Sequence, residues 1–260
     1  MSLPATEQLM GYRVRCDGTT ACLDSIVQSI DDANNARWLA CLNPHSYAVA
    51  LGRPAFDLSL KAADWLLPDG VGIVLASRFL GGHIRERITG TDIFHALHDR
   101  LQAKGGASVF FLGSTEETLA IIRAQVAHDW PALEVAGTYS PPFKPEFSDS
   151  DIDEMVRRIN HARPDVLWVG ISAPKQEELI HRVIDRLDVC FTAAVGAAFD
   201  FYSGRIERSS PAFQKLGLEW LPRLLQEPRR LWRRMFVSAP IFAWHVVQTR
   251  VSLWLPSKRA

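Results

Sequence analysis

Residues 108–129, SVFFLGSTEETLAIIRAQVAHD, contain one strand pattern followed by one helix pattern. Residues 108–112 form an apolar run without alternation, which is typical of a strand buried on both faces of a parallel sheet. The turn Gly113-Ser114 follows, and Ser114 is the predicted N-cap of a helix over residues 115–129. Within this helix, apolar residues recur three or four positions apart, at Leu119, Ile122 and Val126. The stretch therefore predicts one strand–helix unit of an α/β fold.

The same alternation continues on both sides of this unit. Further helical patterns occupy residues 151–160 and 176–187. Four more short apolar runs end at Gly, Asn, Asp or Ser, at residues 36–42, 63–67, 166–171 and 189–195. We therefore predict an α/β fold with a Rossmann-like, mostly parallel sheet and helices on both of its faces. Ligands of such sheets bind beyond the carboxyl ends of the strands, so the polar residues that follow each strand are the functional candidates.

The composition is that of a folded protein. The 260 residues are 47% apolar and 22% charged, which argues against a disordered, collagen-like or disulfide-stapled chain. Four cysteines occur without a CxxC pair, and the first residues lack the basic and apolar regions of a signal peptide. We therefore expect a reducing, cytoplasmic location.

The formal net charge of zero hides an uneven distribution. Residues 204–260 carry eleven Lys and Arg against three Asp and Glu, a net charge of +8, so residues 1–203 carry −8. The same segment holds four of the eight tryptophans, Trp220, Trp232, Trp244 and Trp254. We predict two parts: an α/β body (1–203) that carries the chemistry and a basic, Trp-rich appendage (204–260). We expect no nucleic-acid partner.

Asp69 is the first candidate for chemistry, within the turn PDGVG at residues 68–72. An aspartate that follows a buried strand in a glycine-rich turn projects into the ligand crevice of a parallel sheet. There it could act as a general base for a hydroxyl nucleophile. The alternative is a turn aspartate that hydrogen-bonds its own backbone.

Residues 170–177, GISAPKQE, form a second candidate site. Pro174 can open a helix, whose free N–H groups could receive a phosphate or a sugar hydroxyl, and Lys175 and Gln176 would add side-chain donors. The alternative is an ordinary strand-to-helix turn. Gly113-Ser114 is a weaker candidate phosphate cradle, because only one glycine is present, and the sequence contains neither GxGxxG nor a P-loop.

The appendage contains an arginine cluster at Arg223, Arg229, Arg230, Arg233 and Arg234. Guanidinium groups suit diphosphate oxygens and anionic lipid headgroups equally well, and a solvated basic face is the third interpretation. The following 13 residues, 235–247, are an uninterrupted apolar run that is too short for the roughly 20 residues of a membrane span. They fit a helix lying in the membrane interface, or one packed on the body or on another subunit.

Three patterns that suggest metal sites have simpler explanations. Asp149-Ser150-Asp151 spells DxD, but it stands where a helix begins and fits capping. His95 and His98 lack a third ligand, and Glu177 and His181 lack the HExxH motif. We predict no metal site and no cofactor.

The succession of motifs resembles the WecG/TagA/CpsF glycosyltransferase family (glycosyltransferase family 26). The matching stretches follow one another in order from about residue 39 to residue 234. They are Asn43-Pro44, LPDGVG (67–72), ERITGTD (86–92), FFLGS (110–114), GISAPKQE (170–177), VGAAFDFYSG (195–204) and LEWLPRLLQEPRR (218–230). Cys41 departs from the pattern, because the family usually has Thr two residues before the Asn.

The resemblance implies a bacterial inverting glycosyltransferase. Such enzymes transfer a sugar from a UDP-sugar onto a polyprenyl-diphosphate-linked saccharide, in surface or exopolysaccharide assembly. The expected location is peripheral, on the inner face of the cytoplasmic membrane, which the appendage would contact. Asp69 corresponds to the catalytic base. The expected substrate-binding residues are Asn43, Arg87, Gly113, Gln176, Glu177, Gly196, Asp200, Arg223, Arg230 and Arg233.

Three other interpretations of the sequence stay open. One is a non-catalytic sugar-nucleotide-binding protein of a polysaccharide assembly complex. Another is a nucleotide-dependent oxidoreductase, against which the missing glycine fingerprint counts. The third is a membrane-anchoring module whose appendage is its main function. The sequence specifies neither the donor sugar nor the acceptor glycan, and the apolar tail could instead form a homo-oligomer.

Overall fold

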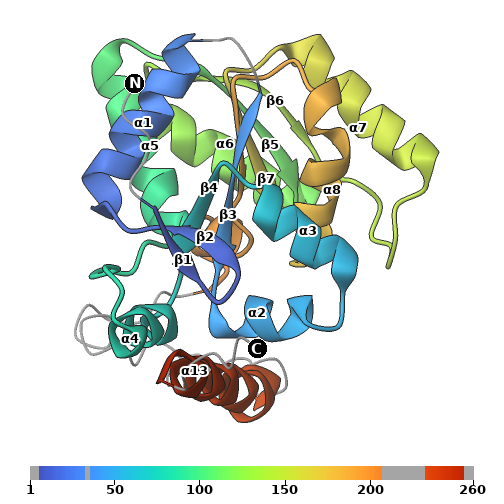
Figure 1. The fold of residues 1–260 in the computed structure, drawn as a ribbon. Helices are drawn as coiled ribbons and strands as arrows, with labels where there is room; N and C mark the ends of the chain where they lie inside the picture. Colours follow the sequence, from blue (N-terminus) through green and yellow to red (C-terminus); the bar gives the residue numbers. More distant parts are fainter. Residues whose placement is uncertain (1–5, 33–35, 207–231, 255–260) are drawn as a thin grey trace.

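The computed structural model describes residues 6–32, 36–206 and 232–254 of the chain. Within these residues, six parallel strands form the main sheet in the order β4-β3-β8-β7-β5-β6 (Figure 1). The strands are β3 (Arg37–Leu42), β4 (Trp65–Pro68), β5 (Ser108–Gly113), β6 (Glu134–Tyr139), β7 (Val166–Gly170) and β8 (Phe191–Ala194). The predicted α/β fold with a mostly parallel sheet is confirmed.

Helices cover both faces of this sheet, and two apolar cores result. In β5, Val109 and Phe111 face one core, whereas Phe110 and Leu112 face the other. The first core is shared with α1 (Gly18–Asp32), α5 (Gly90–Lys104), α6 (Glu116–Asp129) and α9 (Ala198–Tyr202). The second is shared with α2 (Pro44–Ala50), α3 (Pro54–Ala62), α4 (Val71–Leu80), α7 (Asp149–Ala162) and α8 (Lys175–Val183). Burial on both faces explains why the strand sequences are apolar without alternation.

The five strands predicted from apolar runs are all present, with ends shifted by one or two residues. The predicted N-cap of α6 is wrong. Ser114 has a left-handed backbone (φ 58°), and the capping residue is Thr115, whose Oγ1 accepts a hydrogen bond from Thr118 N at 3.3 Å. An N-cap residue needs an extended backbone, which Thr115 has (φ −102°) and Ser114 does not.

Three of the strands were not predicted from the sequence. The edge strand β6 is only half-buried, and β1 (Thr6–Leu9) and β2 (Tyr12–Arg15) form an antiparallel hairpin. The hairpin turn consists of Met10 and Gly11, both with positive φ, which matches the twist of the two strands. β6 forms one edge of the main sheet, and the hairpin is a separate two-stranded sheet.

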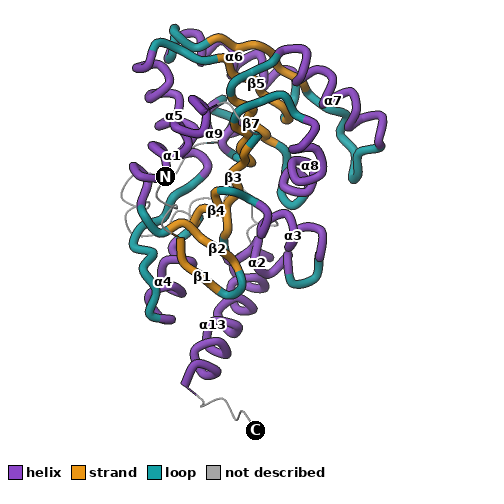
Figure 2. Tube along the Cα trace, turned by 45° about the horizontal axis from the view of Figure 1, so that its top comes forward, coloured by secondary structure: helices purple, strands orange, loops and turns teal. Residues whose placement is uncertain are grey.

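The C-terminal helix α13 (Ala239–Trp254) packs on the body beside α2 and α4, outside the layers of the sheet (Figure 2). Phe242 and Val246 are its buried anchors, and the Phe242 ring meets the Tyr47 ring edge-on at 5.3 Å. Tyr47 Oη also hydrogen-bonds His245 Nδ1 at 2.9 Å. One face of the helix is therefore covered by the body. None of the described helices is both long enough and apolar enough to span a bilayer.

Candidate active site

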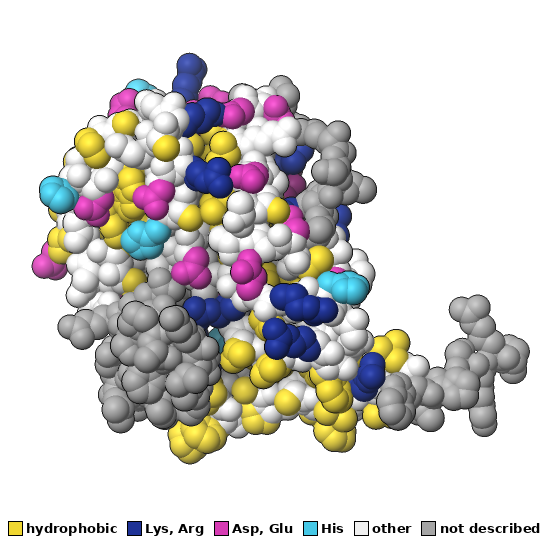
Figure 3. All heavy atoms as spheres, turned by 90° about the vertical axis from the view of Figure 1, so that its left-hand side faces the viewer, with side chains coloured by type: hydrophobic (Ala, Val, Ile, Leu, Met, Phe, Trp, Pro, Cys, Tyr) yellow, Lys and Arg dark blue, Asp and Glu magenta, His cyan; other side chains and the backbone are white. Residues whose placement is uncertain are grey.

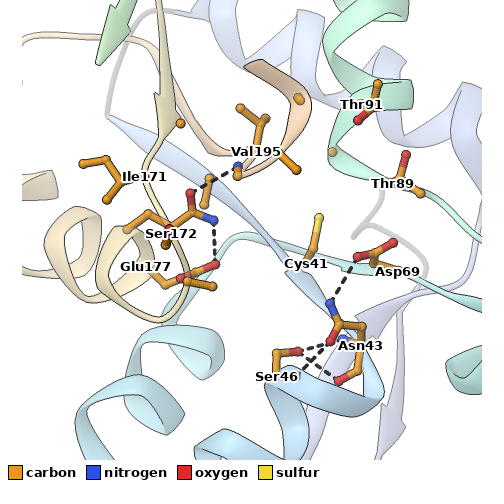
Figure 4. A pocket seen from close by; sticks show the side chains of 18 of the residues that line it. Cys41, Asn43, Ser46, Asp69, Thr89, Thr91, Ile171, Ser172, Glu177 and Val195 are labelled. Carbon is orange, nitrogen blue, oxygen red and sulfur yellow. Dashed lines mark hydrogen bonds between the residues drawn. The ribbon is translucent and has the colours of Figure 1, made fainter. Parts of the chain in front are cut away.

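A pocket of about 220 Å³ opens at the carboxyl edge of the sheet, where β3, β4, β7 and β8 end (Figure 4). This is the edge at which α/β proteins bind ligands. Six of the residues predicted from the sequence line it: Asn43, Asp69, Gln176, Glu177, Gly196 and Asp200. The structure therefore brings together residues that lie up to 157 positions apart in the chain.

Asp69 and Asn43 face each other from neighbouring strand ends. Asp69 N donates to Leu42 O at 2.8 Å, and Asn43 Nδ2 donates to Asp69 Oδ2 at 3.2 Å. Asn43 is also the N-cap of α2, since its Oδ1 accepts from His45 N (3.0 Å) and Ser46 N (2.9 Å). Because the amide oxygen is held by the helix, the amide nitrogen must face Asp69. The cap of α2 thereby fixes the orientation of the Asp69 carboxylate.

A close approach between α2 and α4 keeps these two strand ends together. A Cβ at Gly72, in the first turn of α4, would lie 2.6 Å from Pro44 Cγ, in the first turn of α2. Only glycine allows that distance, so the second glycine of the PDGVG turn is needed for packing against the Asn43-Pro44 pair. Two motifs that are distant in sequence therefore form one wall of the pocket.

The segment of residues 86–92 forms the adjacent wall. Ile88 N donates to Pro68 O at 3.0 Å, and Thr89 caps α5 in a reciprocal pair of hydrogen bonds with Asp92. Thr89 and Thr91 line the pocket, although sequence reasoning did not select them. The sequence feature that could have indicated them is the helix-capping pattern TGTD at residues 89–92. Arg87 is half-buried and is not part of the pocket wall.

Gln176 and Glu177 form the opposite wall at the start of α8. Both side chains are buried, with 4% and 3% exposure. Gly196 N donates to Gln176 Oε1 at 3.1 Å, and Gln176 Nε2 donates to Glu177 Oε1 at 2.9 Å. Burial raises the pKa of Glu177 to about 7, although the hydrogen bond from Gln176 lowers it. Pro174 precedes α8 as its N-cap.

Gly113, the predicted phosphate cradle, does not line the pocket. A Cβ at this position would lie 2.5 Å from Gly170 O, because the ends of β5 and β7 approach each other closely. The geometry gives Gly113 a packing role between two strand ends.

Comparison with known proteins identifies the family. The sequence model of the glycosyl transferase WecG/TagA/CpsF family matches residues 7–255. The chain belongs to this family. It is therefore a glycosyltransferase, and the oxidoreductase interpretation of the sequence is not supported.

Two curated relatives carry the same name, N-acetylglucosaminyldiphosphoundecaprenol N-acetyl-beta-D-mannosaminyltransferase. The protein of Bacillus spizizenii strain W23 is 33% identical over 217 residues, which cover 84% of this chain and 81% of the relative. The protein of Bacillus subtilis strain 168 is 27% identical over 233 residues, which cover 88% and 86% of the two chains. By their names, both act on a polyprenyl-diphosphate-linked sugar.

Arg234, from the segment predicted to be a basic appendage, also lines the pocket. Arg234 belongs to a π-helical segment (Arg234–Ser238), which packs on α2 through a hydrogen bond between Ser238 Oγ and His45 Nδ1 at 2.8 Å. Sequence reasoning selected Arg233, which is exposed and does not line the pocket. The predicted residues Arg223 and Arg230 lie outside the described residues.

Cys41, where the family usually has Thr, lines the same pocket. Burial is the main cause that raises the pKa of its thiol well above the ordinary value, and the nearby Asp69 and Glu177 carboxyls add to the shift. Cys41 is therefore an uncharged thiol at neutral pH, and it supplies neither a negative charge nor a hydroxyl group to this glycosyltransferase site.

The patterns that suggested metal sites serve the fold. Asp149 and Asp151 lie in the first turn of α7, where Asp149 accepts from Arg182 and Asp151 pairs with Lys144. His98 is fully buried and accepts a hydrogen bond from Trp168 Nε1 at 3.0 Å. Among the described residues, no group of three His, Cys, Asp or Glu side chains has an arrangement that could hold a metal ion.

Proposed function

We propose that this glycosyltransferase transfers N-acetylmannosamine from its UDP-activated form onto N-acetylglucosamine linked through diphosphate to a polyprenyl lipid. The names of the two relatives support the sugar and the acceptor. The family resemblance of the motifs supports the UDP donor. The pocket at the carboxyl edge of the sheet suits a nucleotide sugar, because polar residues from several strand ends line it.

Asp69 is the proposed general base, and its orientation by the Asn43 amide is the observation that carries this assignment. Asp69 takes the proton of the acceptor hydroxyl as that oxygen attacks the anomeric carbon. The bond between the anomeric carbon and the diphosphate oxygen breaks, and its electron pair leaves with UDP. A single displacement of this kind inverts the anomeric carbon.

Negative charge develops on the leaving diphosphate, and arginines of the appendage are the proposed partners. Arg234 lines the pocket together with Asp69. Guanidinium groups donate paired hydrogen bonds to phosphate oxygens, and such donors stabilise a leaving group most when they are already in position. We assign the same role to Arg223 and Arg230 on the basis of the sequence.

The proposed membrane contact is an exposed apolar face that two helices share. On α13, Ile241, Trp244, Val247 and Val251 are exposed, and on α4, Val71, Leu75 and Phe79 are exposed. Arg250 of α13 lies over the Phe79 ring at 5.9 Å, so the two sets are neighbours. Figure 3 shows hydrophobic side chains along the lower edge of the molecule, with Lys and Arg directly above them. An apolar face bordered by cations suits an anionic membrane surface that carries the acceptor lipid.

Two measurements on one reaction test the proposed function. The enzyme is mixed with UDP-N-acetylmannosamine and a short-chain lipid diphosphate N-acetylglucosamine, UDP release is recorded, and the linkage of the product is determined by NMR. We expect release that depends on the acceptor and a β-linked product from the α-linked donor. Release with a different UDP-sugar would correct the donor, and an α-linked product would contradict single displacement.

A further inference from the structure

Glu177 and Asp200 add two carboxyl groups to the pocket wall beside Asp69, and the base mechanism does not use Glu177. The residue is 3% exposed, and its Oε1 accepts the hydrogen bond from Gln176. The other oxygen, Oε2, is buried and has no hydrogen-bond partner among the described residues. A buried carboxyl group with a hydrogen bond to only one of its two oxygens lowers the stability of the fold. The position of Glu177 in the pocket therefore calls for an explanation.

The hydrogen bonds show that Glu177 determines how Gln176 is held. The backbone N–H of Gly196 can only donate, so it must meet the oxygen of the Gln176 amide. The amide nitrogen then points to Glu177, which has to accept. With both contacts made, Gln176 presents its remaining N–H and its second lone pair in a fixed direction. Without an acceptor at position 177, one end of this amide is free to turn.

The surroundings of Glu177 disfavour a negative charge on it. Burial is the largest cause of its raised pKa, about 7, and Glu178 of the same helix adds to it. Other titratable and charged groups share its pocket or pair with its helix: Cys41 of β3, Asp69 of β4, Asp200 of α9, Arg234, and Arg53 of α3, which binds Glu178. Of the acids that line the pocket, Glu177 is the most deeply buried. A proton on Glu177 removes a negative charge from the wall that would face a diphosphate.

We infer that Glu177 is a positioning residue with two linked effects: it holds the Gln176 amide toward the nucleotide sugar, and its proton sets the charge of the pocket against that anionic donor. The inference rests on the proposed UDP-sugar donor. Ionised Glu177 still holds Gln176 but repels the diphosphate. Neutral Glu177 also holds Gln176 and does not repel the diphosphate. Donor affinity should therefore fall as the pH rises through neutrality.

Calorimetric titration with UDP-N-acetylmannosamine between pH 5.5 and 8.5 tests the charge effect, because the diphosphate of a UDP-sugar does not change its charge in this range. We expect the wild-type affinity to fall up to about tenfold from pH 6 to pH 8, the limit for one proton taken up by a group whose pKa is about 7 in the free protein. Glu177→Gln, which is always neutral and can still accept from Gln176, should keep the affinity measured at pH 6 throughout. Asp185→Asn, which removes an exposed carboxylate that does not line the pocket, is the matched control and should retain the wild-type pH profile.

Glu177→Ala tests the positioning effect in the same titration. It removes the acceptor as well as the charge, so we expect about fivefold to tenfold weaker donor binding at pH 6, comparable to the loss of one hydrogen bond. Rescue of that loss by Glu177→Gln separates positioning from mere packing. A wild-type pH profile in Glu177→Gln, or wild-type affinity in Glu177→Ala at pH 6, overturns the inference.

A second experiment without ligand keeps the inference distinct from the proposed function. An acid whose pKa rises on folding stabilises the protein fully below its unfolded pKa of about 4.3, and this contribution is lost as the pH rises to the folded value. The Tm of the wild type minus that of Glu177→Gln should therefore fall between pH 4.5 and 7 and then level off. If this curve appears but UDP-sugar binds at no pH, the donor assignment and the donor effect of Glu177 are both wrong. If UDP-sugar binds but this curve is flat, the inference fails and the proposed function stands.

Discussion

Asn43 performs two tasks with one amide group. Its oxygen caps α2, and its nitrogen donates to Asp69. The two tasks support each other, because the cap removes the freedom of the amide to turn away from the carboxylate. A residue chosen only for capping could equally be Ser, Thr or Asp. The donor to Asp69 is what requires Asn.

Asn43→Ser separates the two tasks. Serine is an equally good N-cap, so we expect the free energy of unfolding to change by less than about 1 kcal/mol. The hydrogen bond to a charged group is lost, which corresponds to about 10-fold to 100-fold in kcat if it acts in the transition state. Steady-state kinetics and thermal unfolding of the same sample check both numbers. A stable variant with unchanged kcat would show that Asp69 needs no partner at this position.

Single residues were predictable where they directly follow a buried parallel strand. Asn43, Asp69 and Gly196 follow β3, β4 and β8 within one or two positions, and parallel strands place such residues at one edge. The choice between Arg233 and Arg234 was not predictable in this way. Neighbouring residues on a helix point in different directions, and the contact of this segment with the body joins Ser238 to His45, 193 positions away in the chain.

At the scale of elements, the packing of α4 on α2 aligns the proposed base, Asp69, with its partner, Asn43. Both helices begin directly after a strand, and the contact of Gly72 with Pro44 sets the distance between their first turns. A change in this distance moves Asn43 relative to Asp69 without touching either side chain.

Gly72→Ala should therefore affect both stability and turnover. The added Cβ meets the stiff proline ring at 2.6 Å, and such overpacking costs about 1 to 3 kcal/mol. Gly52→Ala is the matched control, because nothing lies within 4 Å of the added Cβ and the residue's φ is not positive. Urea unfolding and kcat should change in Gly72→Ala and stay near wild type in Gly52→Ala. Equal effects of the two substitutions would contradict the argument.

The elements themselves were predictable in proportion to their burial. The five strands other than β6 in the main sheet have unbroken apolar runs because both of their faces are buried, including those of the other edge strand, β4. The edge strand β6, with the sequence EVAGTY, has no such run because it is half exposed. The hairpin of β1 and β2 is too short for its alternation to stand out, and its turn, Met10-Gly11, is not one of the common hairpin dipeptides.

At the scale of the whole molecule, the C-terminal helix α13 has one face that the body covers and another face that is exposed. Phe242 and Val246 lie against the body, and Trp244 and Val251 remain exposed. The sequence predicted an apolar helix here, but its apolar residues surround the whole helix, so the pattern alone could not say which face the body covers. The participation of α4 in the exposed face follows only from the tertiary structure.

The substitutions Leu75→Glu and Leu58→Glu test whether membrane binding depends on the exposed apolar face of α4 and α13 more than on another part of the surface. Both leucines are exposed to a similar extent, 56% and 59%, but Leu75 lies on α4 beside α13 and Leu58 lies on α3. We expect Leu75→Glu to reduce binding to phosphatidylglycerol vesicles at least about fivefold, because a charge replaces an apolar group at an anionic surface. Vesicle sedimentation at low and high salt measures this. Equal losses in both variants would mean that α4 is not part of the contact.

The central claim is that the Asp69 carboxylate is the base of this glycosyltransferase. The most direct test is the kcat of Asp69→Asn with UDP-N-acetylmannosamine and the lipid diphosphate acceptor. Asp185→Asn, at an exposed residue of the segment Ile184–Arg186, serves as the control, and the thermal unfolding of all three proteins verifies folding. We predict a loss of about 100-fold or more in Asp69→Asn and none in Asp185→Asn, because a neutral amide accepts no proton. A folded Asp69→Asn enzyme that retains near-normal turnover would contradict the account.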